Sequence, residues 1–212
     1  MSLEPDLVVL LKRLKLGQVI PTLPDRLTLA RAQQLDYAAF LTIILADEVQ
    51  RRDSQALERR LSAAGFEERV TLDDFDWTTT IQLDRRHLNE LFSLHFLQKK
   101  EHVLLIGPVG VGKTFLAQAL GASATRAGHQ VLFRRSDLLL RELGQARADH
   151  SFETVFRRYL APDLLVIDDF GLHRLTQQDS EDLYALIIER HRRSCFIVTS
   201  NRDVSEEDQS RR

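Results

Sequence analysis

The eight residues from Gly107 to Thr114, GPVGVGKT, constrain most strongly what this chain can fold into. They match the pattern G-x-x-x-x-G-K-[ST] at each fixed position. The apolar run HVLLI precedes them, and FLAQALGASATRAG follows. Glycine lets the backbone turn tightly and bring its N–H groups close to phosphate oxygens. A strand, this loop and a helix, in that order, predict a phosphate-binding loop at the N-terminus of the helix.

The loop predicts ATP and Mg²⁺ as ligands. Lys113 is expected to reach the β- and γ-phosphates, and Thr114 to offer its hydroxyl to the metal ion. The alternative is a glycine-rich turn that binds nothing. The predicted nucleotide-binding residues are Gly107, Pro108, Val109, Gly110, Val111, Gly112, Lys113 and Thr114.

A second motif, LLVIDDFG, places two carboxylates after four apolar residues. Asp168 is expected to hold Mg²⁺ together with Thr114, directly or through water. Asp169 is the candidate to orient or deprotonate the attacking water. The alternative is a strand that ends in a turn, because Asp and Gly favour turns.

The third motif is FIVTSN, an apolar run that ends in a polar cluster. Asn201 is the candidate to hydrogen-bond the γ-phosphate or the attacking water. An ordinary cap between a strand and a loop would have the same composition.

The alternation of elements predicts the fold class. From residue 102 onward, four short apolar runs alternate with helical segments. This pattern predicts an α/β protein with a parallel sheet that helices cover on both faces, and a ligand site at the carboxyl ends of its strands. We expect a helical N-terminal extension over 1–72, a linker and helix over 73–100 and the nucleotide-binding core over 101–212. Within 73–100, the helix is expected from about 84 to 99.

Two apolar features of the extension and linker suggest packing. Leu41, Ile44, Leu45 and Val49 fall on one stripe of a predicted helix. The linker motif FDW, 75–77, would pack near the adenine ring or act as a hydrophobic staple between the two regions, and both interpretations stay open.

Charge and cysteine content narrow the function classes. The formal net charge of −2 gives no bulk attraction to nucleic acid, so any DNA contact must come from a local patch. Paired arginines such as Arg134–Arg135 and Arg157–Arg158 favour solvated helical ion pairs, with DNA phosphates as the alternative.

A single cysteine, Cys195, excludes an internal disulfide. No apolar run reaches the ~20 residues of a membrane span, so we expect a cytoplasmic protein.

These motifs together resemble the IstB-like ATP-binding proteins, helper ATPases of insertion-sequence transposition in the AAA+ class, related to DnaC helicase loaders. The resemblance runs through ERRLSAAGF, TLDDFDW, GPVGVGKT, LLVIDDFG and IVTSN. It implies that 107–114 form the Walker A loop, that Asp168 and Asp169 form the Walker B pair, and that Asn201 is the sensor-1 residue. Asp169 stands where many AAA+ proteins carry Glu. The resemblance further implies sequence-tolerant DNA association, homo-oligomers on ATP and DNA, and a transposase or replicative helicase that binds the N-terminal region.

After the sensor-1 position, this chain departs from the pattern that the resemblance implies. Relatives continue past sensor 1 into a strand and helices that carry the arginine finger and sensor 2, whereas this chain continues as RDVSEEDQSRR. We therefore expect a core whose C-terminal part is missing, and ATP hydrolysis stays an open question. Three alternatives remain for the function: a DnaC-like helicase loader, a nucleotide-binding remnant without hydrolysis, and a small-molecule kinase.

Overall fold

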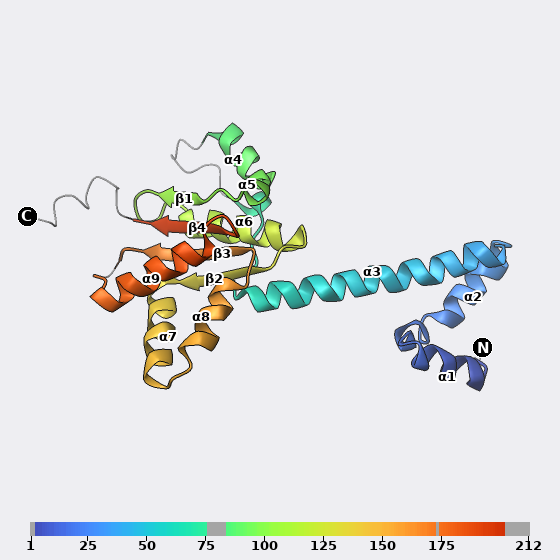
Figure 1. The fold of residues 1–212 in the computed structure, drawn as a ribbon. Helices are drawn as coiled ribbons and strands as arrows, with labels where there is room; N and C mark the ends of the chain where they lie inside the picture. The colour runs from blue at the N-terminus through green and yellow to red at the C-terminus, as the bar shows by residue number, and fades with distance from the viewer. Residues whose placement is uncertain (1–2, 76–83, 173, 202–212) are drawn as a thin grey trace, which may run out of the picture. The chain divides into compact units, whose positions relative to one another are not determined.

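The computed structural model describes residues 3–75, 84–172 and 174–201 (Figure 1). The chain divides into two compact units, 1–58 and 59–212. The functional division at residues 72 and 100 remains a prediction.

The first unit is helical. Its elements are α1 (Pro5–Arg13), the 3₁₀ turn η1 (Gly17–Val19), α2 (Leu23–Ala32) and the first part of the 28-residue helix α3 (Tyr37–Ala64). Its small core is formed by Val19, Leu23 and Ile44, against which Leu11, Leu27 and Phe40 pack. The predicted stripe on α3 therefore buries Ile44 but leaves Leu41, Leu45 and Val49 exposed, because the helices before α3 cover only one side of it.

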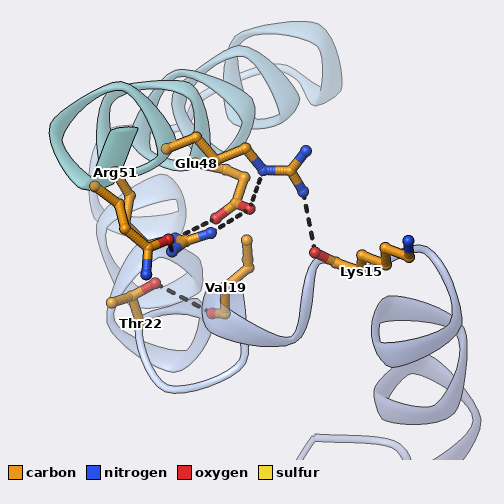
Figure 2. A network of polar contacts seen from close by, with 7 residues as sticks. Lys15, Val19, Thr22, Glu48 and Arg51 are labelled. Carbon is orange, nitrogen blue, oxygen red and sulfur yellow. Dashed lines mark hydrogen bonds and ion pairs between the residues drawn. The ribbon is translucent and has the colours of Figure 1, made fainter. Parts of the chain in front are cut away.

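Arg52, which Glu48 also holds, ties α3 to the turn after α1. Glu48 accepts hydrogen bonds from Arg51 and Arg52, its neighbours three and four residues along the helix, at 2.7 to 2.9 Å. Arg52 also donates to the carbonyl of Lys15 (3.0 Å), and Figure 2 shows this chain of contacts. Hydrogen bonds from the two arginines lower the pKa of Glu48 from 4.5 to about 2.

The helix predicted over 84–99 is two helices, so that expectation was wrong. The segment forms α4 (Arg85–Phe92) and α5 (His95–Lys99), separated at Leu94, whose φ is +61°. A left-handed residue does not continue a right-handed helix. Leu94 packs against the same apolar cluster that buries Phe96 and Leu97 of α5, so the break is accompanied by a contact with the core.

The predicted α/β core is confirmed. Four parallel strands lie in the order β1-β4-β3-β2 (Figure 1). They are β1 (Val103–Ile106), β2 (Val131–Arg135), β3 (Leu164–Phe170) and β4 (Cys195–Ser200). Among the described residues, β4 is the last strand in sequence, and it lies between β1 and β3 in the sheet. This insertion brings the polar ends of β3 and β4 together beside the loop that follows β1.

Helices cover both faces of the sheet. They are α6 (Lys113–Arg126), α7 (Ser136–Ala148), α8 (Phe152–Leu160) and α9 (Gln177–Arg190). Along β3 the side chains alternate between two buried clusters. Leu164 and Val166 pack with Leu120 of α6, while Leu165 and Ile167 pack with side chains of α7, α8 and α9. This alternation explains why the strand reads as an unbroken apolar run, since both of its faces are buried.

A buried arginine joins the end of α8 to the start of β4. Arg190, at the end of α9, donates to the carbonyls of Tyr159, Leu160, Pro162 and Cys195 at 2.8 to 3.2 Å. Burial lowers the pKa of this guanidinium to about 10. The side chain thus supplies donors to carbonyls at the end of α8 and the start of β4.

Across residues 3–75, 84–172 and 174–201, none of the helices is both long and apolar enough to cross a membrane.

Candidate nucleotide-binding site

The loop from Gly107 to Gly112 joins β1 to α6, as predicted. Gly110 and Gly112 both have φ of +84°, a left-handed conformation that favours glycine. Gly112 is the N-cap of α6, so the N–H groups of the first turn of this 14-residue helix face the loop. The helix dipole adds positive potential at the same place. The geometry is that of an anion-binding loop.

Lys113 is the first residue of α6, and its side chain lies against this loop. Its side chain is only 9% exposed, and Nζ donates to the carbonyl of Pro108 over 2.7 Å. Burial lowers the pKa of the amine, while the negative charges of Asp169 and Asp168 oppose that shift. The nearly buried ammonium therefore lies among the loop backbone and the two carboxylates, which suits it to an anionic ligand. Val109, by contrast, is an exposed residue of the loop.

Thr114 and Asp168 meet although 54 residues separate them. The Thr114 hydroxyl lies 3.0 and 3.1 Å from the two carboxylate oxygens of Asp168, which is 2% exposed. A hydroxyl and a carboxylate oxygen side by side are the hard oxygen ligands that Mg²⁺ takes in proteins. The residues present therefore fit the predicted metal ion.

Asp169 adopts an unusual backbone. Its φ is +56°, and the register between β3 and β4 shifts between Ile167 and Phe170. Burial raises the pKa of its carboxyl, and the neighbouring charge of Asp168 adds to the rise, whereas Arg135 and Lys113 counteract it. A raised pKa makes the carboxylate a better proton acceptor than an ordinary aspartate. Its predicted part in orienting or deprotonating water remains a proposal.

Asn201 follows directly after β4 and is half-buried. Among the described residues, the side-chain hydrogen bonds from β4 to Asp168 and Asp169 involve Thr199 rather than Asn201, and Ser200 donates to the carbonyl of the next residue, Phe170. The predicted contact of Asn201 with a γ-phosphate thus stays a prediction. The sequence analysis singled out Asn201 from this polar cluster and did not single out Thr199. The signal was its place in the polar cluster TSN, but the sequence did not show which member turns inward.

A cavity of about 640 Å³ opens beside the loop. It lies between helices α4 and α5 on one side and β1 on the other, and it reaches Gly107, Pro108 and Lys113. Its apolar lining includes Leu88, Leu91, Phe96, Leu104 and Ile106. Charged residues, among them Glu90, Lys99 and Glu101, share this lining, so apolar and charged groups meet in a cavity that continues into the phosphate-binding loop.

Phe75 packs inside the core unit. It is buried with Leu88 and Leu116, and its ring centroid lies 5.5 Å from that of Phe115 on α6. Its contacts are therefore those of an apolar anchor under the phosphate loop. Trp77, the other aromatic residue of the FDW motif, lies outside the described residues.

The arginine pairs of the core mostly meet carboxylates. Arg134 and Arg158 both form ion pairs with Glu142, and Arg135 pairs with Asp137 (3.3 Å). The expected ion pairing is therefore present for these three, although Arg134 and Arg135 lie on the strand β2 and not on a helix.

Comparison with known proteins agrees with this geometry. The family described as IstB-like ATP binding protein matches residues 9–210. A relative from Mycobacterium tuberculosis, named as an ATP-binding protein in an insertion sequence, is 40% identical over 200 residues, which cover 94% of this chain and 80% of the relative. The insertion sequence IS21 ATP-binding protein of Pseudomonas aeruginosa is 34% identical over 197 residues, covering 93% and 74%.

Solved structures share the fold of the core. A DnaC helicase loader superposes with a TM-score of 0.54 at 23% identity, covering 72% of this chain and 85% of the loader. AMPPCP-bound DnaA from Aquifex aeolicus gives a TM-score of 0.59 at 20% identity, covering 67% of this chain and 45% of DnaA. The present chain thus spans less than half of that DnaA chain. These likenesses show that the core shares its fold with DnaC and DnaA.

Proposed function

The chain belongs to the IstB-like ATP-binding protein family of insertion sequences, and we propose that it binds ATP with Mg²⁺ and assists DNA transposition. One observation carries the nucleotide proposal. The hydroxyl of Thr114, at the start of α6, lies within 3.1 Å of both oxygens of Asp168, at the end of β3. Two motifs far apart in sequence thereby form a single group of oxygen ligands next to the phosphate loop.

The chain's own residues have distinct parts in this proposal. The backbone of the phosphate loop and Lys113 hold the phosphates, and Thr114 with Asp168 holds the cation. Mg²⁺, when bound, neutralises charge on the β- and γ-phosphates. Asp169, with its raised pKa, is the group that would accept a proton from an attacking water. Asn201 is proposed to orient that water or the γ-phosphate.

The test of nucleotide binding uses the full chain and mant-ATP, a fluorescent ATP analogue. We expect saturable, Mg²⁺-enhanced binding that Lys113→Ala weakens strongly. An exposed lysine outside the site, Lys12→Ala, is the matched control. Equal binding by the wild-type chain and Lys113→Ala would contradict the proposal.

Hydrolysis is measured on the same preparations, with and without DNA. DNA-stimulated release of phosphate that Asp169→Asn abolishes would identify the chain as an ATPase. Lys113-dependent binding without release would instead favour the alternative function of a nucleotide-binding protein without hydrolysis. The insertion-sequence relatives favour transposition over helicase loading, since the DnaC likeness at 23% identity concerns the fold alone.

We place a partner-binding surface on the first unit, with the transposase as its occupant. Tyr37, Leu41, Leu45 and Val49 recur every fourth residue along α3, and each is more than half exposed. An exposed apolar stripe on a helix suits the apolar face of a partner helix. Leu45→Asp should abolish co-purification with the transposase of the same insertion sequence, whereas Gln50→Asp, an exposed polar position of α3, should not.

Association with DNA and self-assembly complete the proposal. We expect sequence-tolerant DNA binding that weakens steeply with salt, because phosphate contacts release counterions. Fluorescence anisotropy at several salt concentrations tests this expectation. Homo-oligomers are expected on ATP and DNA, and sedimentation with and without both ligands tests them. The proposed location is the cytoplasm, where the buried thiol of Cys195 stays reduced.

A further inference from the structure

The hydroxyl of Thr199 bonds both members of the Walker B pair. The side chain is 1% exposed and belongs to β4. Its Oγ1 donates to Oδ1 of Asp168 over 2.5 Å and accepts from the backbone N–H of Asp169 over 2.9 Å. A hydroxyl has one proton to donate, and here that proton is directed at the carboxylate that faces Thr114.

Two further hydroxyls hold the same stretch of backbone. Ser136, at the start of α7, donates to the carbonyl of Asp169, and Ser200 donates to the carbonyl of Phe170, both over 2.9 Å. The left-handed conformation of Asp169 is rare for a residue other than glycine. Such a conformation persists where its surroundings determine it fully, and it concentrates at functional sites. The hydroxyl of Thr199 holds this backbone and also donates to the carboxylate of Asp168.

We propose that Thr199 is a positioning residue that orients Asp168 for the metal ion of Mg²⁺–ATP; this rests on the proposed nucleotide binding. Oδ1 of Asp168 accepts from both Thr199 and Thr114. The bond from Thr199 fixes the carboxylate from the β4 side, so its orientation does not depend on Thr114 alone. Partners of metal ligands that act in this way affect metal affinity by roughly 10- to 100-fold.

The test compares variants of the full chain. Mg²⁺ is titrated at a fixed concentration of mant-ATP, and the concentration at half-maximal enhancement of binding is measured. Thr199→Val keeps the shape but removes the hydroxyl, and we expect the half-maximal Mg²⁺ concentration to rise about tenfold or more. Thr199→Ser should restore it. Ser136→Ala removes a hydroxyl bond to the same backbone but none to a carboxylate, and should change it less than about twofold.

The mant-ATP affinity in EDTA separates positioning from a structural role. It should stay near the wild-type value in Thr199→Val, because the phosphate loop is untouched. A wild-type Mg²⁺ titration in Thr199→Val, or an equal change in Ser136→Ala, would overturn the inference.

Two further outcomes are distinguishable. If circular dichroism shows that Thr199→Val does not fold, Thr199→Cys, which retains only a weak donor, is titrated instead, and a wild-type response there overturns the inference. A wild-type chain without Lys113-dependent binding would overturn the proposed function itself, and this inference with it.

Discussion

The ring of Phe75 lies 3.1 Å from the point that a Cβ on Gly112 would occupy. Gly112 is the last loop residue before α6 and has a φ of +84°. An aromatic residue from the linker thus fills the space behind the phosphate loop. Gly112 meets two requirements at once, since its backbone is left-handed and its missing side chain leaves room for the ring.

Gly112→Ala should therefore weaken mant-ATP binding by roughly tenfold or more, since the left-handed backbone costs ~1–2 kcal/mol for a residue with a Cβ and the ring must move as well. Gly128→Ala is the control. Gly128 has a φ of +100°, and nothing lies within 4 Å of its Cβ position. This variant should therefore lose a similar amount of unfolding free energy to the left-handed backbone, yet it should bind mant-ATP normally. Equal binding by both variants would contradict the role assigned to the ring.

Two helical glycines should respond oppositely to alanine. A Cβ on Gly121 of α6 would lie 2.8 Å from the ring of Phe66, whereas one on Gly144 of α7 meets nothing within 4 Å. Gly121→Ala should destabilise the protein by about 1–3 kcal/mol through overpacking. Gly144→Ala should stabilise it by about 0.5–1 kcal/mol because alanine favours the helix. Urea unfolding followed by far-UV circular dichroism measures both, and a stabilising Gly121→Ala would show that the ring yields freely.

Replacing Arg190 by Met should lower the free energy of unfolding by about 3 kcal/mol or more. The substitution leaves buried carbonyls of Tyr159, Pro162 and Cys195 without this donor. The matched control is Arg193→Met. Arg193 is 78% exposed in its ion pair with Glu189, so its loss should change stability by less than about 0.5 kcal/mol. Similar losses in both variants would refute the structural role of Arg190.

The contribution of Glu48 to the stability of the first unit should decline in acid. The pKa of this carboxyl is lowered to about 2 in the folded chain from an ordinary 4.5. A lowered pKa contributes stability fully above about pH 4.5, and the contribution declines as pH falls toward 2. Glu48→Gln should accordingly be less stable than wild type at pH 7, with a difference that shrinks below pH 4.5.

Urea unfolding at a series of pH values gives this difference. Glu4→Gln, which alters an exposed carboxylate of the same unit, is the control and should track the wild type throughout. A Glu48→Gln difference that stays constant from pH 7 to pH 2 would show that the ion pairs with Arg51 and Arg52 contribute no pH-dependent stability.

Local patterns were sufficient to predict the core elements. Each strand is a run of apolar residues between turn or polar residues. In the loop 107–114, the spacing of Gly107, Gly112, Lys113 and Thr114 is typical of a phosphate-binding loop. The single helix predicted over 84–99 is wrong because the chain turns at Leu94, a left-handed residue that packs against the core cluster containing Phe96, and no local pattern marks this turn. Likewise, Leu41, Leu45 and Val49 have the period of a buried face but remain exposed, because periodicity does not reveal whether a partner surface is present.

The sequence by itself determined the phosphate loop, the carboxylates that end β3 and the α/β class, because these depend on residues close together along the chain. Tertiary structure alone decided which polar groups meet. The insertion of β4 between β1 and β3 brings Thr199 to Asp168, 31 residues away, and the packing of α6 on the sheet brings Thr114 to the same carboxylate. Strand order and a left-handed Asp169 arise from contacts between distant segments, and no local pattern encodes them.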